Sequence, residues 1–318
     1  MYVGIDLGGT AIKLAIVNAE GEIIFKDSQP TQVAEGGDKI LHQMNDMIET
    51  GVQSLGISKT ELKGIGIGAP AFLDLERGFV FEAVNLNWKD YPLKDRLEKI
   101  TGLDVIVDND ANTAALGEMW KGAGQGTKEL LVITLGTGVG GGLISGGNIL
   151  HGYKGTGGEI GHVTVMPEEG YRCNCGKIGC LETIASATGI VRLATDALDK
   201  GEESVLSNVL ATNGSIEAKD IAVAAQEGDA LALNILDKVG FYLGLALGNY
   251  AVLLNPEKIV IGGGVSKAGD ILFQPIRNYY RKFALTHLTG EIEINAATLG
   301  NDAGVIGSAW LVHKKVNN

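Results

Sequence analysis

Short apolar runs separated by glycine-containing turns open the chain. Residues 2–5, 11–17 and 23–26 are dominated by Ile, Val and Leu, and a hairpin-type turn at residues 18–21 separates the last two runs. The pattern changes between residues 38 and 55, where apolar side chains recur at helical spacing on one face. The first part of the chain is therefore predicted to form three strands followed by an amphipathic helix.

The remaining hydrophobic pattern alternates strand-like and helix-like segments. Further strands are predicted at residues 65–67, 105–107, 130–135, 140–144, 149–150, 258–261 and 292–296. Further helices are predicted at residues 93–100, 109–122, 188–200, 218–226, 230–254, 268–283 and 304–313.

The order of these elements repeats along the chain. Each half of the chain begins with a strand, a glycine turn and two more strands, and then continues with helices; the second half starts at residue 130. This repetition predicts two duplicated α/β lobes with an active-site cleft between them. We expect a small N-terminal lobe at residues 1–116 and a large lobe at residues 117–302. A C-terminal helix at residues 303–318 is expected to pack back on the small lobe.

Composition and charge exclude several classes of protein. The 318 residues include 47 glycines, roughly 15% against a usual ~7%, but they have no triplet period and only 6 prolines, which excludes a collagen-like chain. An apolar fraction of 45% excludes a disordered chain. The formal net charge of −12 argues against a nucleic-acid partner, although backbone N–H groups can still bind a small anion.

Two further patterns bear on location. The first residues lack the basic segment of a signal peptide, and the apolar stretch at residues 239–254 is shorter than the ~20 residues of a membrane span. We predict a buried helix there, with Gly240, Gly244 and Gly248 on one face for close packing within a lobe or across a dimer. A cytoplasmic protein with no membrane partner is expected.

A pair of glycine turns occupies matching places in the two halves. Residues 6–10 read Asp-Leu-Gly-Gly-Thr, and residues 135–138 read Leu-Gly-Thr-Gly. Backbone N–H groups of such turns can surround a phosphate. Because the Asp6 carboxylate would repel bare phosphate, it implies a cation between them, and Mg²⁺ suits oxygen ligands. The alternative is two ordinary hairpins.

The segment Asp108-Asn109-Asp110-Ala111-Asn112 follows a predicted strand and begins a predicted helix. A carboxylate at that place can accept a proton from a substrate hydroxyl as its oxygen attacks phosphorus. The alternative is a simple helix N-cap formed by Asn or Asp. The residue types alone leave both interpretations open.

All the cysteines lie in one short segment. Cys173, Cys175 and Cys180 follow His162, and an odd number of cysteines does not form a disulfide framework. Three thiolates and one imidazole match a closed, structural Zn²⁺ site. The alternative is three reduced thiols near a surface loop. Glu159 and Glu182 flank the segment, and without a ligand they would be solvated acids.

A third glycine turn, at residues 262–264, follows a predicted strand and precedes a predicted helix. It would allow the backbone to approach a flat ligand such as adenosine. The alternative is a plain turn between a strand and a helix.

Taken together, these motifs resemble the ROK family of bacterial sugar kinases. The resemblance rests on DLGGT at residues 6–10, NDAN at 109–112, LGTGVGGG at 135–142, GGEIGH at 157–162 and CNCGKIGCLE at 173–182, and it extends from Val3 to Trp310. It implies an actin-like, ribonuclease H-like fold and ATP-dependent phosphorylation of a sugar. Within the family, Asn85-Leu86-Asn87-Trp88 resembles the glucokinases of Gram-positive bacteria.

The resemblance also implies a role for individual residues. Asp110 would be the general base, and glucose would be held by Gly68, Asn85, Asn109, Asp110, Glu159, His162 and Glu182. ATP and Mg²⁺ would be held by Asp6, Gly8, Gly9, Thr10, Lys13, Gly136, Thr137 and Gly138, with Gly263 and Gly264 near adenosine. His162, Cys173, Cys175 and Cys180 would bind structural zinc. The family further suggests a homodimer, or a tetramer.

Three other functions compete with this interpretation. Sugar-responsive repressors of the same family carry an N-terminal helix-turn-helix extension, for which the start of the first motif at Asp6 leaves no room. An actin-like or chaperone-like ATPase would not need the NDAN and GGEIGH segments. A kinase for another sugar, such as N-acetylmannosamine, allose or fructose, is the strongest alternative, because selectivity depends on loop geometry that the sequence does not give.

Overall fold

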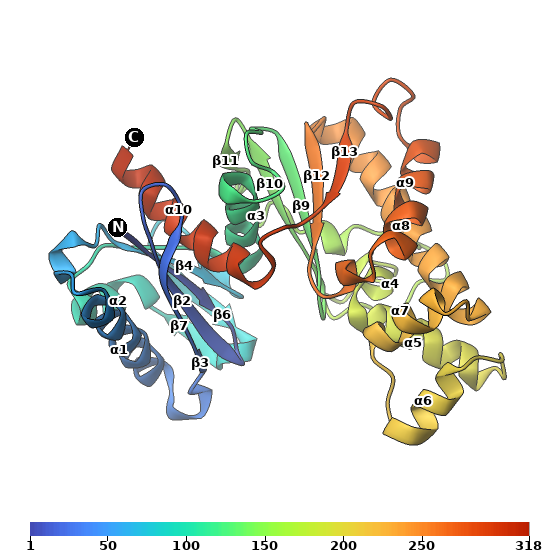
Figure 1. Ribbon diagram of the computed structural model, residues 1–318, viewed down its shortest axis with the longest axis horizontal. Coiled ribbons are helices and arrows are strands. Elements are labelled where there is room, and N and C mark those ends of the chain that lie inside the picture. Colours follow the sequence, from blue (N-terminus) through green and yellow to red (C-terminus); the bar gives the residue numbers. More distant parts are fainter. Residues whose placement is uncertain (318) are drawn as a thin grey trace. The chain divides into compact units, whose positions relative to one another are not determined.

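Two five-stranded sheets of matching topology form the framework of the protein (Figure 1). The structure is a computed structural model and describes residues 1–317. The strand order is β3-β2-β1-β4-β8 in the first sheet and β11-β10-β9-β12-β13 in the second. The duplicated order predicted from the sequence is therefore confirmed.

The strands of both sheets follow the apolar runs of the sequence. In the first sheet they are β1 (Tyr2–Leu7), β2 (Ala11–Val17), β3 (Ile23–Pro30), β4 (Ile65–Ala69) and β8 (Val105–Asn109). In the second they are β9 (Leu130–Leu135), β10 (Val139–Ser145), β11 (Asn148–Ile149), β12 (Lys258–Gly262) and β13 (Glu293–Ala296). In each sheet a hairpin is followed by parallel strands, β1-β4-β8 and β9-β12-β13, so helices must connect the parallel strands.

The α-helices agree with the predicted segments and add two more. Their bounds are α1 (Gly37–Leu55), α2 (Leu93–Thr101), α3 (Asp110–Lys121), α4 (Glu182–Ala185), α5 (Ala187–Asp199), α6 (Leu206–Asn213), α7 (Ala218–Gln226), α8 (Ala230–Leu254), α9 (Asp270–Phe283) and α10 (Ala303–Asn317). Short 3₁₀ helices lie at Val33–Glu35, Lys59–Glu61, Val84–Leu86, Ile160–His162, Val265–Ala268 and Gly300–Asp302. The short helices α4 and α6 were not predicted, and α9 begins later than expected because Gly269 adopts a φ of 71°.

A small third sheet was also missed. It consists of β5 (Phe72–Asp74), β6 (Phe79–Ala83) and β7 (Trp88–Tyr91), all antiparallel. The hydrophobic pattern is weak there, because several outward-facing positions are charged or exposed. This sheet carries the chain from the end of β4 to α2.

The chain divides into two compact units whose boundaries differ from those expected. The first unit contains residues 1–128, 142–158 and 298–318, and the second contains residues 129–141 and 159–297. Helix α3 thus continues the first unit beyond the predicted boundary at residue 116. Its packing gives the reason, because Gly117 lies against the backbone of Ala303, and Gly142 lies against Ala115.

In the first unit, α10 packs directly on the strands and on α3 (Figure 1). A Cβ atom on Gly4 would lie 1.9 Å from the Val305 carbonyl oxygen, and one on Gly66 would lie 1.8 Å from that of Ser308. Only glycine permits such a close approach of helix and strand backbones. Apolar residues of α1 are fully buried against the same unit, including Ile40, Leu41, Met44, Met47 and Ile48.

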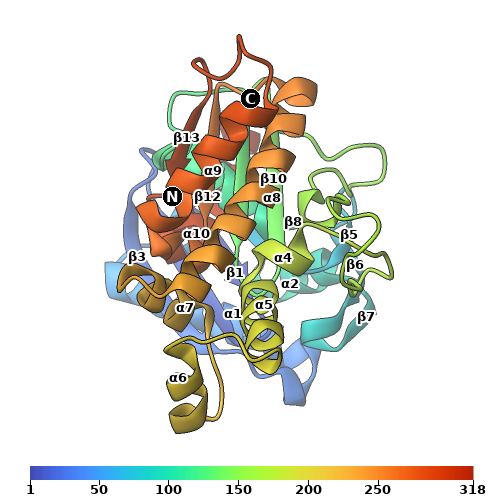
Figure 2. The ribbon, with the colours of Figure 1, turned by 90° about the vertical axis from the view of Figure 1, so that its right-hand side faces the viewer.

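In the second unit, α8 and α9 lie side by side (Figure 2). The glycine stripe of α8 forms this contact, because Cβ atoms on Gly240 and Gly244 would lie 2.4 and 2.5 Å from the Cβ atoms of Pro275 and Tyr279. The stripe therefore packs within a unit. Helix α8 is also long and apolar enough to cross a membrane by length and composition, and 56% of its most apolar window is buried in the protein.

Candidate functional site

Parallel pairing brings three motifs to one edge of the first sheet. In the register, Asp6 of β1 lies beside Gly68 of β4, and Gly68 lies beside Asp108 of β8. The next pair joins Ala69 to Asn109. Because the carboxyl ends of these strands coincide, the first glycine turn, Gly68 and the Asn109–Asp110 segment share one edge. This is the edge at which open α/β sheets bind ligands.

The first glycine turn is tight and its acidic residue is paired. The N–H of Gly8 donates to the Ala11 carbonyl oxygen at 2.9 Å, which closes the turn that leads on to Thr10. The Lys13 Nζ lies 2.9 Å from Asp6 Oδ2. A Cβ on Gly9 would lie 2.7 Å from the carbonyl oxygen of Asn85, so the backbone of the turn meets the loop that carries Asn85.

Asp110 is the first residue of α3, and Asn109 is its N-cap. The Asn109 Oδ1 accepts hydrogen bonds from the N–H groups of Ala111 and Asn112, at 2.8 and 3.4 Å. The Asp110 Oδ1 accepts from the Ala111 N–H at 2.9 Å. The N-cap interpretation of Asn109 is therefore confirmed. Asp110 therefore lies in the first turn of α3, where a helix favours an acidic side chain.

Asp108, buried beneath this segment, has a partner that the sequence did not suggest. Its side chain is 4% exposed, and its Oδ2 lies 2.7 Å from the Nε2 of His151. Its Oδ1 accepts from the Asn112 side chain at 2.8 Å and from the Asn109 N–H at 2.7 Å. The His151 carbonyl oxygen accepts from the Gly157 N–H at 2.7 Å. His151 thus joins the loop after β11 to the residues around Asp110.

The second glycine turn, Gly136–Gly138, rests on the start of α5. The Gly136 N–H donates to the Gly138 carbonyl oxygen at 2.9 Å, and the Ala187 N–H donates to that of Gly136 at 2.8 Å. The Thr188 hydroxyl donates to the Thr137 carbonyl oxygen at 3.0 Å. These bonds fix the turn at the end of β9.

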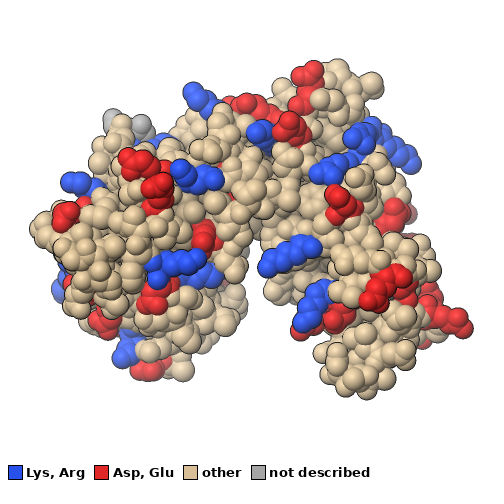
Figure 3. Space-filling view, in the orientation of Figure 1, with Lys and Arg blue, Asp and Glu red and all other residues tan. Residues whose placement is uncertain are grey.

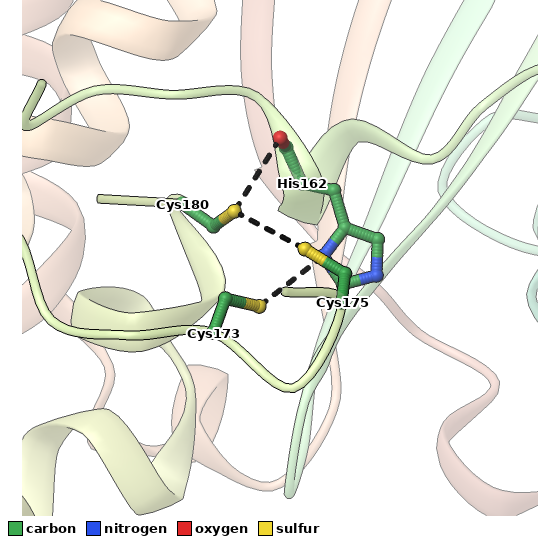
Figure 4. A group of neighbouring side chains, drawn as sticks. All are labelled: His162, Cys173, Cys175 and Cys180. Atoms are coloured by element: carbon green, nitrogen blue, oxygen red, sulfur yellow. Dashed lines mark hydrogen bonds between the residues drawn. The ribbon is translucent and has the colours of Figure 1, made fainter. Parts of the chain in front are cut away.

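A cluster of possible metal ligands follows in the second unit (Figure 4). One ligand atom from each of His162, Cys173, Cys175 and Cys180 lies within 4.8 Å of the others. The His162 Nδ1 is 3.6 Å from Cys173 Sγ, and the Cys175 and Cys180 sulfur atoms are 3.6 Å apart. The structure therefore brings together all four predicted ligands as a possible metal site.

The pKa values of the three thiols are shifted by their surroundings. Burial raises the pKa of the Cys173 thiol, and it raises the pKa of Cys180 to about 12. The Lys177 backbone N–H lowers the pKa of the exposed Cys175 thiol. A bound cation would keep the two buried sulfur atoms as thiolates, which is the form that binds metals.

The two acids beside this cluster are placed differently. The Glu159 Oε2 lies 3.9 Å from His162 Nε2, the ring nitrogen that does not point at the sulfur atoms. The Glu182 Oε2 accepts from the Val139 N–H at 3.1 Å, and its Oε1 accepts from the Cys173 thiol at 3.6 Å. Glu182 therefore bridges the cysteine loop and the second glycine turn.

A cavity of about 810 Å³ opens beside the second glycine turn. Such a volume suits a nucleotide-sized ligand. Gly264 lines it, whereas Gly263, with a φ of 89°, packs its backbone against Leu135. Most of its walls come from segments that carry no recognisable motif, and they include Val191, Ile216, Glu217, Lys219, Ala222, Val223, Gln226 and Lys267. Sequence reasoning missed these residues because only the fold brings α5, α7 and residues 264–268 together.

Charged side chains of both signs alternate over the face shown in Figure 3. On that face, the described Lys and Arg residues do not gather into one extended patch.

A family model, a curated relative and solved structures all match this chain over nearly its whole length. A model of the ROK family matches residues 2–315. The chain is 54% identical over 317 residues to a glucokinase of Halalkalibacterium halodurans, covering 100% of this chain and 96% of that protein. The structure of a ROK family glucokinase from Streptomyces griseus in complex with glucose and AMPPNP matches with a TM-score of 0.81 at 35% identity, covering 98% and 99% of the two chains.

A ROK hexokinase from Thermus thermophilus matches with a TM-score of 0.83 at 31% identity, covering 99% of this chain and 98% of that one. Each solved structure covers nearly the whole chain, which confirms the actin-like α/β fold that the sequence motifs implied.

We predict that His151→Phe destabilises the protein, because it removes a hydrogen-bonding partner from the buried Asp108 carboxylate. The expected loss is about 1–3 kcal/mol in the free energy of unfolding. His151→Gln keeps a donor at similar reach and should lose less. Urea denaturation of both variants measures this. If His151→Phe unfolds at the wild-type midpoint, the contact does not stabilise the fold.

Proposed function

This chain belongs to the ROK family, and on that basis we propose that it transfers the γ-phosphoryl group of ATP to glucose, giving glucose 6-phosphate and ADP. The similarity to a glucokinase over the full chain supports glucose as the acceptor. The observation that carries the proposal is the shared edge of β1, β4 and β8, where Asp110 lies with the first glycine turn.

Asp110 is proposed as the general base. Its carboxylate accepts the proton of the sugar's 6-hydroxyl while that oxygen attacks the γ-phosphorus, and the bond from phosphorus to the ADP oxygen breaks. The N-cap bonds of Asn109 fix the first turn of α3 and hence the place of the Asp110 side chain. Positioning of this kind contributes to the rate without any further chemistry.

Contacts to the sugar hydroxyls are proposed for residues of both units. In the first unit they are Gly68, Asn85, Asn109 and Asp110, and in the second they are Glu159, His162 and Glu182. Thr113 lies so close to Gly68 that a side chain there would overlap its hydroxyl at 2.2 Å. Glycine at position 68 therefore allows Thr113 of α3 to pack closely against β4.

The nucleotide is proposed to occupy the 810 Å³ cavity, with its adenosine near Gly264 and its phosphates at the second glycine turn. Gly136, Thr137 and Gly138, together with Asp6, Gly8, Gly9, Thr10 and Lys13, are the proposed phosphate and Mg²⁺ residues. Mg²⁺, when bound, neutralises charge on the donor phosphates. In the structure, the Lys13 Nζ is the cation paired with the Asp6 carboxylate, at 2.9 Å.

Zinc is the metal proposed for the cysteine cluster. A tetrahedral site with Zn–S bonds of about 2.3 Å places neighbouring sulfur atoms about 3.8 Å apart, close to the 3.6 Å between Cys175 and Cys180. With Nδ1 directed at the metal, the His162 Nε2 remains available beside Glu159. The metal would thus fix the orientation of a sugar-binding imidazole.

We further propose that the enzyme acts in the cytoplasm as a homodimer. Exposed apolar side chains at the end of α8, Val252 and Leu253, are 51% and 78% exposed and would favour burial between copies. Sedimentation velocity of the purified protein measures the assembly directly.

The proposed reaction predicts that ADP forms from ATP only when a hexose is present. Glucose should give the highest kcat/KM in a panel that includes N-acetylmannosamine, allose and fructose, because hydroxyl-reading contacts discriminate strongly. A coupled assay for ADP measures each rate, with a reaction lacking sugar as control. ADP release without sugar at the same rate would contradict a kinase, and a higher kcat/KM for another sugar would contradict glucose.

Metal analysis of the purified protein is predicted to give about one zinc per chain. Cys175→Ser removes one proposed ligand, so it should lose most of this zinc and lower the melting temperature. Because Cys175 is exposed, its replacement disturbs little packing, and the change in stability then reports the loss of metal. Asn174→Ser, at the neighbouring position, is the control and should keep the metal. A folded, active wild-type protein without zinc would remove the proposed site.

A further inference from the structure

A second, smaller cavity of about 190 Å³ lies in the second unit, next to the nucleotide-sized one. It is bounded by the second glycine turn, the cysteine loop and the start of α5, and two arginines, Arg172 and Arg192, line it. We call it the arginine pocket. It shares Thr137 and Thr188 with the larger cavity, so the two are neighbours.

The arginines of this pocket are not neutralised by the protein. Among residues 1–317, neither guanidinium forms an ion pair with a carboxylate. The Arg192 guanidinium lies over the Tyr171 ring, 5.0 Å from its centre, and the Tyr171 hydroxyl donates to Asp196. Arg192 is thus held in place through an aromatic contact, which leaves its N–H groups for a ligand.

Neutral donors complete the lining. Ser186 is 1% exposed and caps α5, where its Oγ accepts from the Gly189 N–H at 3.0 Å. Its hydroxyl hydrogen can therefore be donated to a ligand. Thr137 lines the same space. The positive end of the α5 dipole adds to the field of the arginines.

One acidic side chain, Glu182, also lines the pocket. Its Oε2 accepts from the Val139 N–H at 3.1 Å, so this oxygen atom already has a partner within the protein. The lining thus has two guanidinium groups against one carboxylate, in a chain whose formal net charge is −12. A small, cationic, hydroxyl-lined cavity in such a chain matches an oxyanion rather than a neutral ligand.

We propose that the arginine pocket binds a phosphate group through Arg172, Arg192 and the Ser186 hydroxyl. Planar guanidinium groups bind phosphate oxygens in pairs, and the pocket adjoins the turn assigned to the donor phosphates. The ligand is the terminal phosphate of bound ATP or a free phosphate ion. The identification of the ligand as the terminal phosphate of ATP rests on the proposed function, whereas the binding of a phosphate group to this pocket does not.

The test uses the zinc-loaded, full-length protein and inorganic phosphate as the probe. Calorimetry measures phosphate affinity without turnover, and initial rates give the KM values for ATP and glucose. Arg192→Gln removes the positive charge, whereas Arg192→Lys keeps the charge but lacks the planar guanidinium group. Arg281→Gln, on the exposed end of α9, is the matched control.

Arg192→Gln should weaken phosphate binding or raise the KM for ATP at least about tenfold, equivalent to about 1.4 kcal/mol. Arg192→Lys should recover part of the loss, and Arg281→Gln should resemble the wild type, while the KM for glucose stays within about twofold in all of them. Phosphate that competes with ATP identifies the terminal phosphate as the ligand. Phosphate that binds alongside ATP identifies a separate ion.

The proposal is overturned if Arg192→Gln and Arg192→Lys both leave phosphate affinity and the KM for ATP at wild-type values. It is also overturned if the wild type binds no phosphate and Arg192→Gln keeps the wild-type KM for ATP. Failure of the proposed function gives a different result, because phosphate would then still bind in an Arg192-dependent way to a protein that phosphorylates no hexose.

Discussion

The hydrogen-bond register of the parallel strands β1, β4 and β8 is the constraint on which the site depends. A slip of one residue would turn every side chain to the other face of the sheet. In the observed register, Asp6, Gly68 and Asp108 form one row across the sheet, with Asn109 and Asp110 immediately beyond it. The glycines at the interface with α10 maintain this arrangement, because the helix backbone touches the strands at Gly4 and Gly66.

The second sheet has the same strand order and brings different motifs together. Its register places Gly262 of β12 beside Thr134 of β9, so the second and third glycine turns share an edge as well. What this unit adds is the cysteine cluster, whose loop reaches the second glycine turn through Glu182. One duplicated framework thus carries the Asn109–Asp110 segment in one unit and a nucleotide-sized cavity in the other.

Local motifs and periodicity were sufficient for the elements that have a clear physical signal. The amphipathic helix at residues 38–55, the apolar strand at residues 130–135 and the clustering of Cys173, Cys175, Cys180 with His162 all appear in the structure as expected. The edge formed by Asp6, Gly68 and Asn109 depends on long-range strand pairing. The family resemblance assigned these residues to ligand binding, but neither the resemblance nor hydrophobic periodicity predicted that they share one edge of the sheet.

The features that were missed have no short-range signal. His151 is the partner of Asp108 although 43 residues separate the two in the sequence, and no recognisable motif surrounds it. Lys219, Lys267 and Arg192 come from separate elements that the fold assembles around two cavities. The small sheet at residues 72–91 has too few buried side chains in alternating positions for its strands to be predicted from hydrophobic periodicity.

The most direct test of Asp110 as the general base is the turnover of Asp110→Asn at saturating ATP and glucose, combined with the affinity of the same variant for glucose. Asparagine keeps the shape of the side chain but cannot accept the hydroxyl proton. We expect a kcat at least about 10²-fold lower with glucose affinity nearly unchanged, while Asp95→Asn, in the first turn of α2, should behave as the wild type. A kcat near the wild-type value in Asp110→Asn would contradict the assignment of the base and of the edge that presents it.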